Sequence, residues 1–462
     1  MSTAIVWFRR DLRLADNPAL CAACAAHQHI VPVYIDAPEE LAPWQPGSAS
    51  RWWLHHSLAS FQAVLGERGT ALVVRQGASL PTLRTLASET GASAVYWNRC
   101  YEPAEIARDT AVKVGLREIG LQVESCNAAL IAEPWAVATG AGEPYRVFTP
   151  FWRNVVERPV RSPLPIPEWR PGPVPASVPL AALGLLPTRP WDGGLRAAWT
   201  PGEAGAAAEA RRFFTQAAAG YALQRDFPAE PGTSRLSPHL HFGEIGPVQL
   251  HALARQLQPP DGGPGFAAFW RELGWREFAH HLLYHYPRTT DEPLDRRYQA
   301  FPWRGSATYA ADLRAWQRGV TGIDIVDAGM RELWHTGWMH NRVRMLVASL
   351  LTKNLRIPWQ AGARWFWDTL VDADLANNTL GWQWTAGCGA DAAPYFRIFN
   401  PMLQAKKFDP DGAYVQRWLA HAPAGPGGWQ VGASASVSRP IVDLAASRAA
   451  ALAAYDRIRG ER

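Results

Sequence analysis

Cysteine is scarce in this chain of 462 residues: there are five, and they are scattered. Cys21 and Cys24 form a CxxC pair, but neither a second pair nor a histidine cluster completes the ligand set of a zinc site. We therefore expect reduced, structural thiols and predict no metal site.

Long hydrophobic runs are also absent. No uncharged stretch is long enough to span a bilayer, and Arg9 and Arg10 directly follow the apolar residues 4–8, unlike in a signal peptide. The sequence therefore predicts a cytoplasmic protein without a membrane partner. No GxGxxG follows the first apolar run, so the first domain lacks the dinucleotide-binding fingerprint.

Net charge is low, at +5 with a pI near 9.0, which permits contact with a polyanion without requiring it. Tryptophan, by contrast, is abundant, with 23 residues. Buried indoles need a partner for their N–H. Clustered tryptophans therefore indicate stacking or electron transfer in addition to core packing.

Hydrophobic periodicity predicts an α/β domain at residues 1–130. Short apolar runs alternate there with helical segments, which is typical of a parallel sheet with helices on both faces. The expected strands are 4–8, 30–35, 71–75 and 94–96, and the expected helices are 18–27, 50–66 and 81–90.

The remainder of the chain divides into a linker and a helical domain. Prolines crowd residues 158–201, which disfavours long helices, and we assign residues 131–201 to an interdomain linker. Residues 202–462 show helical periodicity without alternating strands, which predicts an all-α domain. Its expected helices are 206–220, 247–256, 266–286, 309–318, 325–334, 341–353, 362–370 and 441–459.

Three polar motifs in the helical domain each allow two interpretations. Residues 233–238 (TSRLSP) suit a phosphate at a helix start, or ordinary capping. Glu272, Trp275 and Arg276 share a helix face and can form one site, although the motif alone favours a surface ion pair beside a core indole. Asp372 and Asp374 have metal-ligand spacing, but no histidine is placed near them in the sequence, so we expect Arg344 as the partner.

Five segments together resemble the DNA photolyase and cryptochrome family, over nearly the whole chain. They are WFRRDLR (7–13), TSRLSPHLHFGE (233–244), ELGWREF (272–278), TGWMHNRVRM (336–345) and DADLANNTLGWQWTAGCGADAAPYFRIFNP (372–401). The resemblance is greatest to bacterial cyclobutane pyrimidine dimer photolyases of class I or class III. It implies a Rossmann-like α/β domain, a long linker and a helical FAD-binding domain.

The resemblance implies a bound FAD and assigns its contacts. Asp372 and Asp374 would meet the polar edge of the isoalloxazine, with Arg344 pairing Asp372. Asn378 would face flavin N5, where plant cryptochromes have an aspartate, and this favours repair over signalling. The phosphates and ribityl chain would be held by Tyr221, Thr233, Ser234, Arg235, Leu236 and Ser237.

The resemblance also implies an electron supply through Trp382, Trp359 and Trp303, with Trp316 assigned to the core. Short hops through indoles are faster than one long jump, because tunnelling falls exponentially with distance.

UV-damaged DNA is the implied partner. Asn341 and Met345 stand where (6-4) photolyases have two histidines, so the expected lesion is the cyclobutane dimer, flipped out of the duplex. Glu272 and Asn341 would bind the pyrimidine edges, and Arg342 the cavity or a nearby phosphate. Trp275 and Trp384 would form the stacking walls. The iron–sulfur branch of the family needs four clustered cysteines, which this chain lacks.

The α/β domain is expected to hold an antenna pigment near residues 51–56 and 98–105. We expect 5,10-methenyltetrahydrofolate, with a deazaflavin as the alternative, and a monomeric protein. The rival function is a cryptochrome-like photoreceptor without repair activity, which the short segment after Arg417 disfavours. Without the resemblance, a flavoprotein oxidoreductase would also remain open, although no nicotinamide motif supports it.

Overall fold

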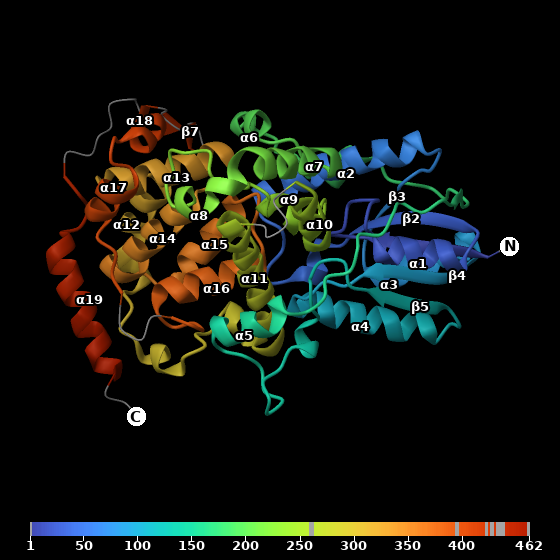
Figure 1. Ribbon diagram of the computed structural model, residues 1–462, viewed down its shortest axis with the longest axis horizontal. Coiled ribbons are helices and arrows are strands. Elements are labelled where there is room, and N and C mark those ends of the chain that lie inside the picture. Colours follow the sequence, from blue (N-terminus) through green and yellow to red (C-terminus); the bar gives the residue numbers. More distant parts are fainter. Residues whose placement is uncertain are drawn as a thin grey trace.

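The computed structural model describes residues 2–257, 263–392, 397–420, 424–425, 429–430 and 439–459. The α/β part and the helical part lie side by side along the longest axis, and the two termini are at opposite ends (Figure 1). Among the described residues, no helix combines the length and apolar character needed to cross a bilayer.

The α/β part is built on a parallel sheet in the order β3-β2-β1-β4-β5, which confirms the predicted fold class. The strands are β1 (Thr3–Phe8), β2 (His29–Asp36), β3 (Val73–Gln76), β4 (Ala92–Asn98) and β5 (Gln122–Cys126). The helices between them are α1 (Pro18–Ala26), α2 (Ser48–Glu67), α3 (Ser79–Thr90) and α4 (Pro103–Arg117).

Both faces of this sheet are covered, which explains why its strands are continuously apolar. Ala4, Val6 and Phe8 of β1 pack with residues of α1 and α2 in one hydrophobic cluster. Ile5 and Trp7 point to the opposite face and pack with residues of α3 and α4 in another. Successive side chains of a strand alternate between the two faces, so β1 contributes to both cores.

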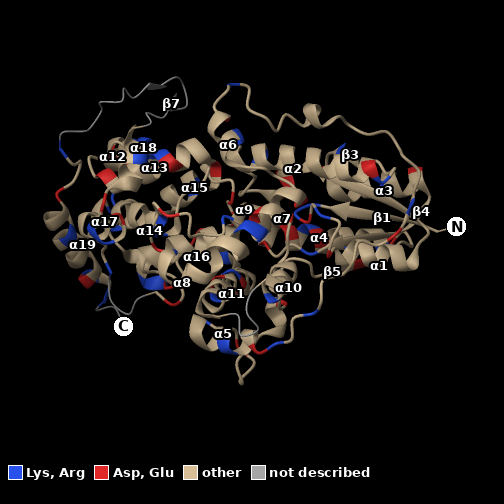
Figure 2. Cartoon of the chain, turned by 45° about the horizontal axis from the view of Figure 1, so that its top comes forward, with Lys and Arg blue, Asp and Glu red and all other residues tan. Residues whose placement is uncertain are grey.

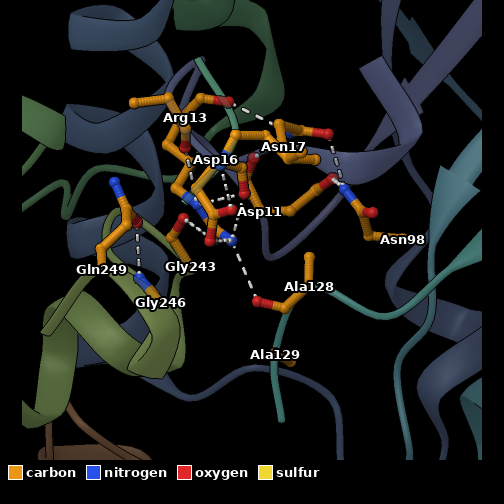
Figure 3. Close-up of polar contacts among 12 residues, drawn as sticks. Asp11, Arg13, Asp16, Asn17, Asn98, Ala128, Ala129, Gly243, Gly246 and Gln249 are labelled. Carbon is orange, nitrogen blue, oxygen red and sulfur yellow. Dashed lines mark hydrogen bonds and ion pairs between the residues drawn. The ribbon is translucent and has the colours of Figure 1, made fainter. Parts of the chain in front are cut away.

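Arg13 connects the loop after β1 to the helical part (Figure 3). Its buried guanidinium donates to the carbonyls of Asp16 at 2.8 Å, Ala128 at 2.9 Å and Gly243 at 2.8 Å. Asn98, at the end of β4, donates to Asp11 at 2.7 Å. Two of the segments that carry the resemblance, 7–13 and 233–244, are therefore in direct contact.

The proline-rich segment runs back along the sheet. Its short strand β6 (Arg170–Pro171) pairs with β2 at His29 and Ile30, which β3 leaves open because β3 pairs only from Val33 onward. Further on, the backbone N–H of Val178 donates to the carbonyl of Val74 at 2.9 Å. The helices of the linker are short: α5 (Phe148–Val156) and α6 (Gly193–Ala198).

The helical part contains the expected elements and several more. The long helices are α7 (Glu203–Arg212), α10 (Pro247–Leu257), α11 (Gly263–His285), α12 (Ser306–Arg318), α13 (Asp324–Thr336), α14 (Asn341–Ser349), α15 (Trp359–Thr369), α16 (Leu375–Ala386) and α19 (Leu444–Arg459). The shorter ones are α8 (Tyr221–Gln224), α9 (Ser237–His241), α17 (Pro401–Phe408) and α18 (Ala413–Ala420). Periodicity did not indicate α16, α17 or α18.

Two predicted helices are wrong in their extent. The segments 206–220 and 341–353 each stop being α-helical early and continue as π-helical turns, at Phe213–Ala217 and Leu350–Asn354. A π turn holds an extra residue and changes which side chains face the core. Phe213 and Phe214, which are adjacent in this turn, are both buried.

All five cysteines are free, as expected. Burial raises the pKa of the Cys24 thiol to about 12, so this CxxC is not poised as a reactive thiolate at neutral pH.

Candidate functional site

Arg344 and Asp372 form a hydrogen-bonded ion pair between α14 and the loop before α16. The Arg344 Nη2 atom lies 2.8 Å from Asp372 Oδ2, and its Nε donates to the carbonyl of Met339 at 2.7 Å. Asp372 is buried. A buried carboxylate is tolerated when its partner is fully engaged in this way.

Asp374 begins α16 as its N-cap. Its Oδ1 accepts from the backbone N–H of Asn377 at 2.8 Å and from the Asn377 side chain at 2.7 Å. On its other side, His241 Nδ1 and His280 Nε2 each lie 3.6 Å from Oδ2. The expectation that no histidine stands near these carboxylates is therefore wrong, because histidines distant in sequence are brought here by α9 and α11.

The charge state of Asp374 follows from these neighbours. Burial alone would raise its pKa, but His280 and His241 hold that pKa well below the ordinary range of an aspartate. The side chain is therefore an acceptor only.

Asn378 lies one turn further along α16 and is half-buried. Its Nδ2 donates to the carbonyl of Ala363 in α15 at 3.1 Å. This bond fixes the orientation of the amide and leaves its oxygen for another partner.

The segment 233–237 is held by Arg212, whose Nη2 donates to the carbonyl of Thr233 at 2.9 Å. Arg235 has a left-handed backbone with φ 52°, and its guanidinium lies over Trp199 and Trp338, 4.2 and 5.1 Å from the ring centroids. Trp338 in turn donates to Ser237 Oγ at 3.3 Å. The helix α9 starts at Ser237 and is only five residues long.

These groups fit the phosphates of a dinucleotide cofactor. The Nη2 of Arg235 is buried and has no hydrogen-bond partner within the described structure. An unpaired buried guanidinium N–H is costly, and a phosphate oxygen would satisfy it. The hydroxyls of Thr233, Ser234 and Ser237 lie beside it in the chain, next to the buried Leu236. Tyr221 is 8% exposed.

Two of the residues expected to meet a lesion form ion pairs with a neighbouring segment of the chain. Glu272 of α11 pairs with Arg225, and Arg342 of α14 pairs with Asp226, with Nη2 2.7 Å from Oδ1. Arg225 and Asp226 were not anticipated from the sequence. The sequence indicated them only weakly, as two adjacent residues of opposite charge that follow Tyr221, which had been assigned to the cofactor site.

Other members of the lesion set lie around Arg342. Its guanidinium covers the ring of Phe408, 4.4 Å from the centroid, and its Nη1 is 4.0 Å from the sulfur of Met345. Asn341 is exposed as the first residue of α14.

The two indoles expected as stacking walls are half-buried. Trp275 stacks on Phe148 of α5, with ring centroids 3.7 Å apart and planes 7° apart. One face of Trp275 is therefore already covered, and only the opposite face is left for another ring. Arg276 turns away from Glu272 and donates to the carbonyl of Ala129 at 2.7 Å.

The tryptophans assigned to electron supply lie around α15 and α16. Trp382 and Trp359 are each 2% exposed, and the half-buried Trp303 contacts Phe301 at 4.5 Å between centroids. The rings beside Trp382 are Phe366 at 5.0 Å and Trp316 at 6.2 Å. Trp316 is fully buried, in agreement with its assignment to the core, and donates to the carbonyl of Val347 at 3.0 Å.

A second candidate site is a cavity of about 520 Å³ between the two parts. Its lining includes Arg9, Arg10, Arg51, Glu102, Glu105 and His241. Arg9 and Arg10 follow β1, and Glu102 and Glu105 follow β4. In the sheet, β1 lies between β2 and β4, so the strand order changes direction at β1. Ligands of such sheets bind at this switch point, outside the carboxyl ends of the strands.

The polar groups of this cavity form a compact network. Arg10 is paired with both Glu102 and Glu105. Burial raises the pKa of Glu105 to about 8, with Arg10 opposing the rise and Glu102 adding to it. Of residues 51–56, Arg51 and Leu54 line the cavity. Trp52 and Trp53 are buried instead, and donate to Asp192 and Glu244 at 2.9 Å.

Basic and acidic residues are interleaved over both parts of the molecule (Figure 2).

Pro394, Tyr395 and Phe396, in the last of the five resembling segments, lie outside the described residues.

Comparison with known proteins shows which family the chain belongs to. Residues 4–170 match the family described as DNA photolyase, and residues 269–457 match the FAD binding domain of DNA photolyase. A deoxyribodipyrimidine photo-lyase from Agrobacterium fabrum is 45% identical over 98% of both chains. Cryptochrome-2 of Arabidopsis thaliana is 36% identical over 98% of this chain and 79% of that protein.

The fold comparison gives the same result. The crystal structure of a bacterial class III photolyase from Agrobacterium tumefaciens matches 99% of this chain and 98% of its own, with a TM-score of 0.91 and 44% identity. The chain belongs to the DNA photolyase and cryptochrome family.

Proposed function

We propose that this protein is a deoxyribodipyrimidine photo-lyase, which uses blue light to split cyclobutane pyrimidine dimers in DNA. The observation that carries the proposal is the full-length similarity, which is higher to the Agrobacterium fabrum photo-lyase, at 45%, than to the plant cryptochrome, at 36%. The alternative is a photoreceptor without repair activity.

FAD is the cofactor, and residues of α14 and α16 would hold its ring system. When bound, reduced FAD supplies the electron that enters the dimer after light absorption. Arg344 and Asp372 would fix the polar edge of the ring, and Asp374 would accept a hydrogen bond without donating one. Asn378 is neutral and supplies no proton. Tyr221 and residues 233–237 would bind the phosphates and ribityl chain, with the unpaired Nη2 of Arg235 as the support for this placement.

The dimer would enter beside α11 and α14 after flipping out of the duplex. Glu272 and Asn341 would bind the pyrimidine edges, Trp275 and Trp384 would cover the bases, and Met345 would contact them from α14. Arg342 would contact the neighbouring phosphate. The partners Arg225 and Asp226 would hold Glu272 and Arg342 in place before DNA arrives, and this reduces the entropy lost on binding.

For the electron supply we keep the order Trp382, Trp359 and Trp303. For the antenna we propose the cavity between the two parts, with 5,10-methenyltetrahydrofolate as first candidate and a deazaflavin as alternative. Extraction of the pigment and its absorption spectrum distinguish the two.

We further propose a cytoplasmic monomer with an α/β domain at 1–130, a linker at 131–201 and a helical domain at 202–462.

The test is repair of a thymine-dimer oligonucleotide by the reduced holoprotein, under blue light and in the dark. We expect intact thymines to be recovered only in the illuminated sample. Equal recovery in light and dark, or none in either, would contradict repair and favour the photoreceptor.

A further inference from the structure

Three metal-ligating side chains converge where the cavity meets the helical part, and a histidine lies beside them. Glu102, His280 and Asp374 each present one ligand atom, and these atoms all lie within 4.8 Å of one another. The three residues are buried, at 5%, 4% and 7% exposure. His241, from the end of α9, lies beside this group, with Nδ1 3.6 Å from Asp374 Oδ2.

The hydrogen bonding of His280 fixes which of its nitrogens faces the carboxylates. Its Nδ1 lies 2.9 Å from the carbonyl oxygen of Arg276, and a carbonyl only accepts, so Nδ1 carries the proton. Nε2 is therefore the atom directed at Asp374. A metal-bound histidine typically has this arrangement, with its other N–H donated to a backbone carbonyl.

The distances from the two imidazole nitrogens to Asp374 are longer than those of a direct hydrogen bond. A protonated Nε2 would bond directly to the carboxylate at about 2.8 Å, yet both imidazole nitrogens are 3.6 Å from Asp374 Oδ2. Ligand atoms about 2.1 Å from a tetrahedral zinc ion are separated from one another by roughly 3.4 Å. The two separations of 3.6 Å from Asp374 Oδ2 are close to that of groups sharing an ion.

His241 supplies an independent observation. Its side chain is 6% exposed, and its Nδ1 is a buried atom with no hydrogen-bond partner within the described structure. A buried, unpaired imidazole nitrogen is costly, and coordination to a metal would remove that cost.

The neighbouring cations have carboxylate or carbonyl partners of their own. Arg10 is paired with Glu102 and Glu105, and Arg276 donates to the carbonyl of Ala129. These partners offset the positive charges that would otherwise weaken cation binding. Imidazole and carboxylate together favour a transition metal over calcium or magnesium.

We propose that His280, Asp374 and Glu102 bind one divalent transition metal ion, of which Zn²⁺ is the best match, and that His241 turns toward the ion as the fourth ligand when it is bound. The ion ties together the start of α4, the end of α9, the middle of α11 and the start of α16. The site lies at the wall of the cavity and does not depend on repair activity.

The test is zinc binding by the FAD-containing holoprotein. After treatment with a chelator and removal of that chelator, the protein is titrated with ZnCl₂ and its metal content is measured by mass spectrometry. We expect about one equivalent of zinc in the wild type. His280→Ala and His241→Ala should each weaken binding at least tenfold, while His27→Ala, distant from the cluster, should not.

Zinc-edge X-ray absorption on the wild-type protein provides a second measurement that does not require the variants to fold. We expect two imidazole nitrogens and carboxylate oxygens around the metal. Failure of the wild type to take up zinc, a ligand shell without imidazole, or equal affinity in the His280 variant and the control would overturn the proposal. Flavin absorbance and circular dichroism report whether each variant is folded.

Discussion

Asn378 and Trp382 are four residues apart on α16 and therefore lie on the same side of that helix. In the proposed enzyme, one sets the protonation environment of the flavin and the other delivers its electrons. The Asn378 amide is fixed by the carbonyl of Ala363, and the indole of Trp382 is enclosed by Phe366 and Trp316. Single side chains at this scale can be tested one by one.

Trp382→Phe should block photoreduction of the oxidised flavin and leave repair by already reduced enzyme intact. The reason is that Trp382 supplies electrons to the flavin, whereas repair needs only transfer from the reduced flavin to the dimer. Flavin absorbance under illumination measures the first, and dimer repair the second.

A pair of variants tests which tryptophan passes the electron to Trp382. Trp359→Phe should slow photoreduction strongly, whereas Trp316→Phe should leave it nearly unchanged. The reverse result would route the electron through Trp316, whose ring is 6.2 Å from that of Trp382.

Glu272→Ala should weaken binding of the dimer oligonucleotide about tenfold, as expected for loss of one hydrogen bond from a charged group. The ratio of FAD to protein should not change, because the proposed role of Glu272 is on the lesion side. Binding is measured by titration, with the exposed Glu230→Ala as control. Loss of FAD in the Glu272 variant would show that the residue belongs to the cofactor site instead.

At the scale of elements, α15 and α16 approach closely because Gly362 has no side chain. A Cβ at this position would lie 2.0 Å from Cη2 of Trp382 and 2.6 Å from Leu351 Cδ2. The glycine thus determines where Trp382 sits.

Gly362→Ala should lower the free energy of unfolding by about 1–3 kcal/mol, because overpacking moves the indole or the helices. Gly381→Ala, on α16 with nothing within 4 Å of its added Cβ, is the matched control. It should raise stability by up to about 1 kcal/mol through helix propensity. Chemical denaturation measures both, and equal effects of the two changes would refute the packing argument.

The elements also show what sequence reasoning reached. Alternating apolar runs predicted the parallel sheet, because a strand buried on both faces must be continuously apolar. The helix α16 was missed because its first turn contains Asn377 and Asn378, which are poor helix formers. The histidines near Asp374 were missed because they come from α9 and α11, and only tertiary packing brings them together.

The same limit applies to the indoles and ion pairs. Trp275 was correctly placed on a helix, but its stacking on Phe148 depends on how α5 docks, which no local pattern reveals. Arg225 and Asp226 carried almost no sequence signal for their pairing with Glu272 and Arg342.

At the scale of the whole molecule, Glu277 of α11 joins the helical part to the start of the linker. Its Oε2 accepts from the backbone N–H groups of Ile131 at 2.9 Å and Ala132 at 3.2 Å. Burial raises the pKa of this carboxyl from 4.5 to about 7, although Arg276 and the two amides oppose the rise.

The stability of the protein should therefore fall between pH 4.5 and 7. The folded chain keeps the Glu277 proton up to about pH 7, while the unfolded chain releases it near pH 4.5. In that window the folded state binds more protons, so raising the pH lowers the free energy of unfolding, by on the order of 3 kcal/mol for this group.

Glu277→Gln keeps an acceptor for both amides but does not titrate, so it should remove that part of the decline. Urea denaturation at pH 5 and pH 7.5 measures the change, with the exposed Glu230→Gln as control. A pH dependence identical to that of the wild type would exclude Glu277 as the source.

The strand β6 has a consequence for biosynthesis. The free edge of β2 at His29 and Ile30 is paired by Arg170 and Pro171, and Val74 of β3 is bonded to Val178. A nascent chain that has only just released residues 1–130 from the ribosome still exposes this edge to other polypeptides. The α/β domain can close only after a further stretch of linker has been synthesised, so translation speed through the proline-rich segment sets how long that edge stays open.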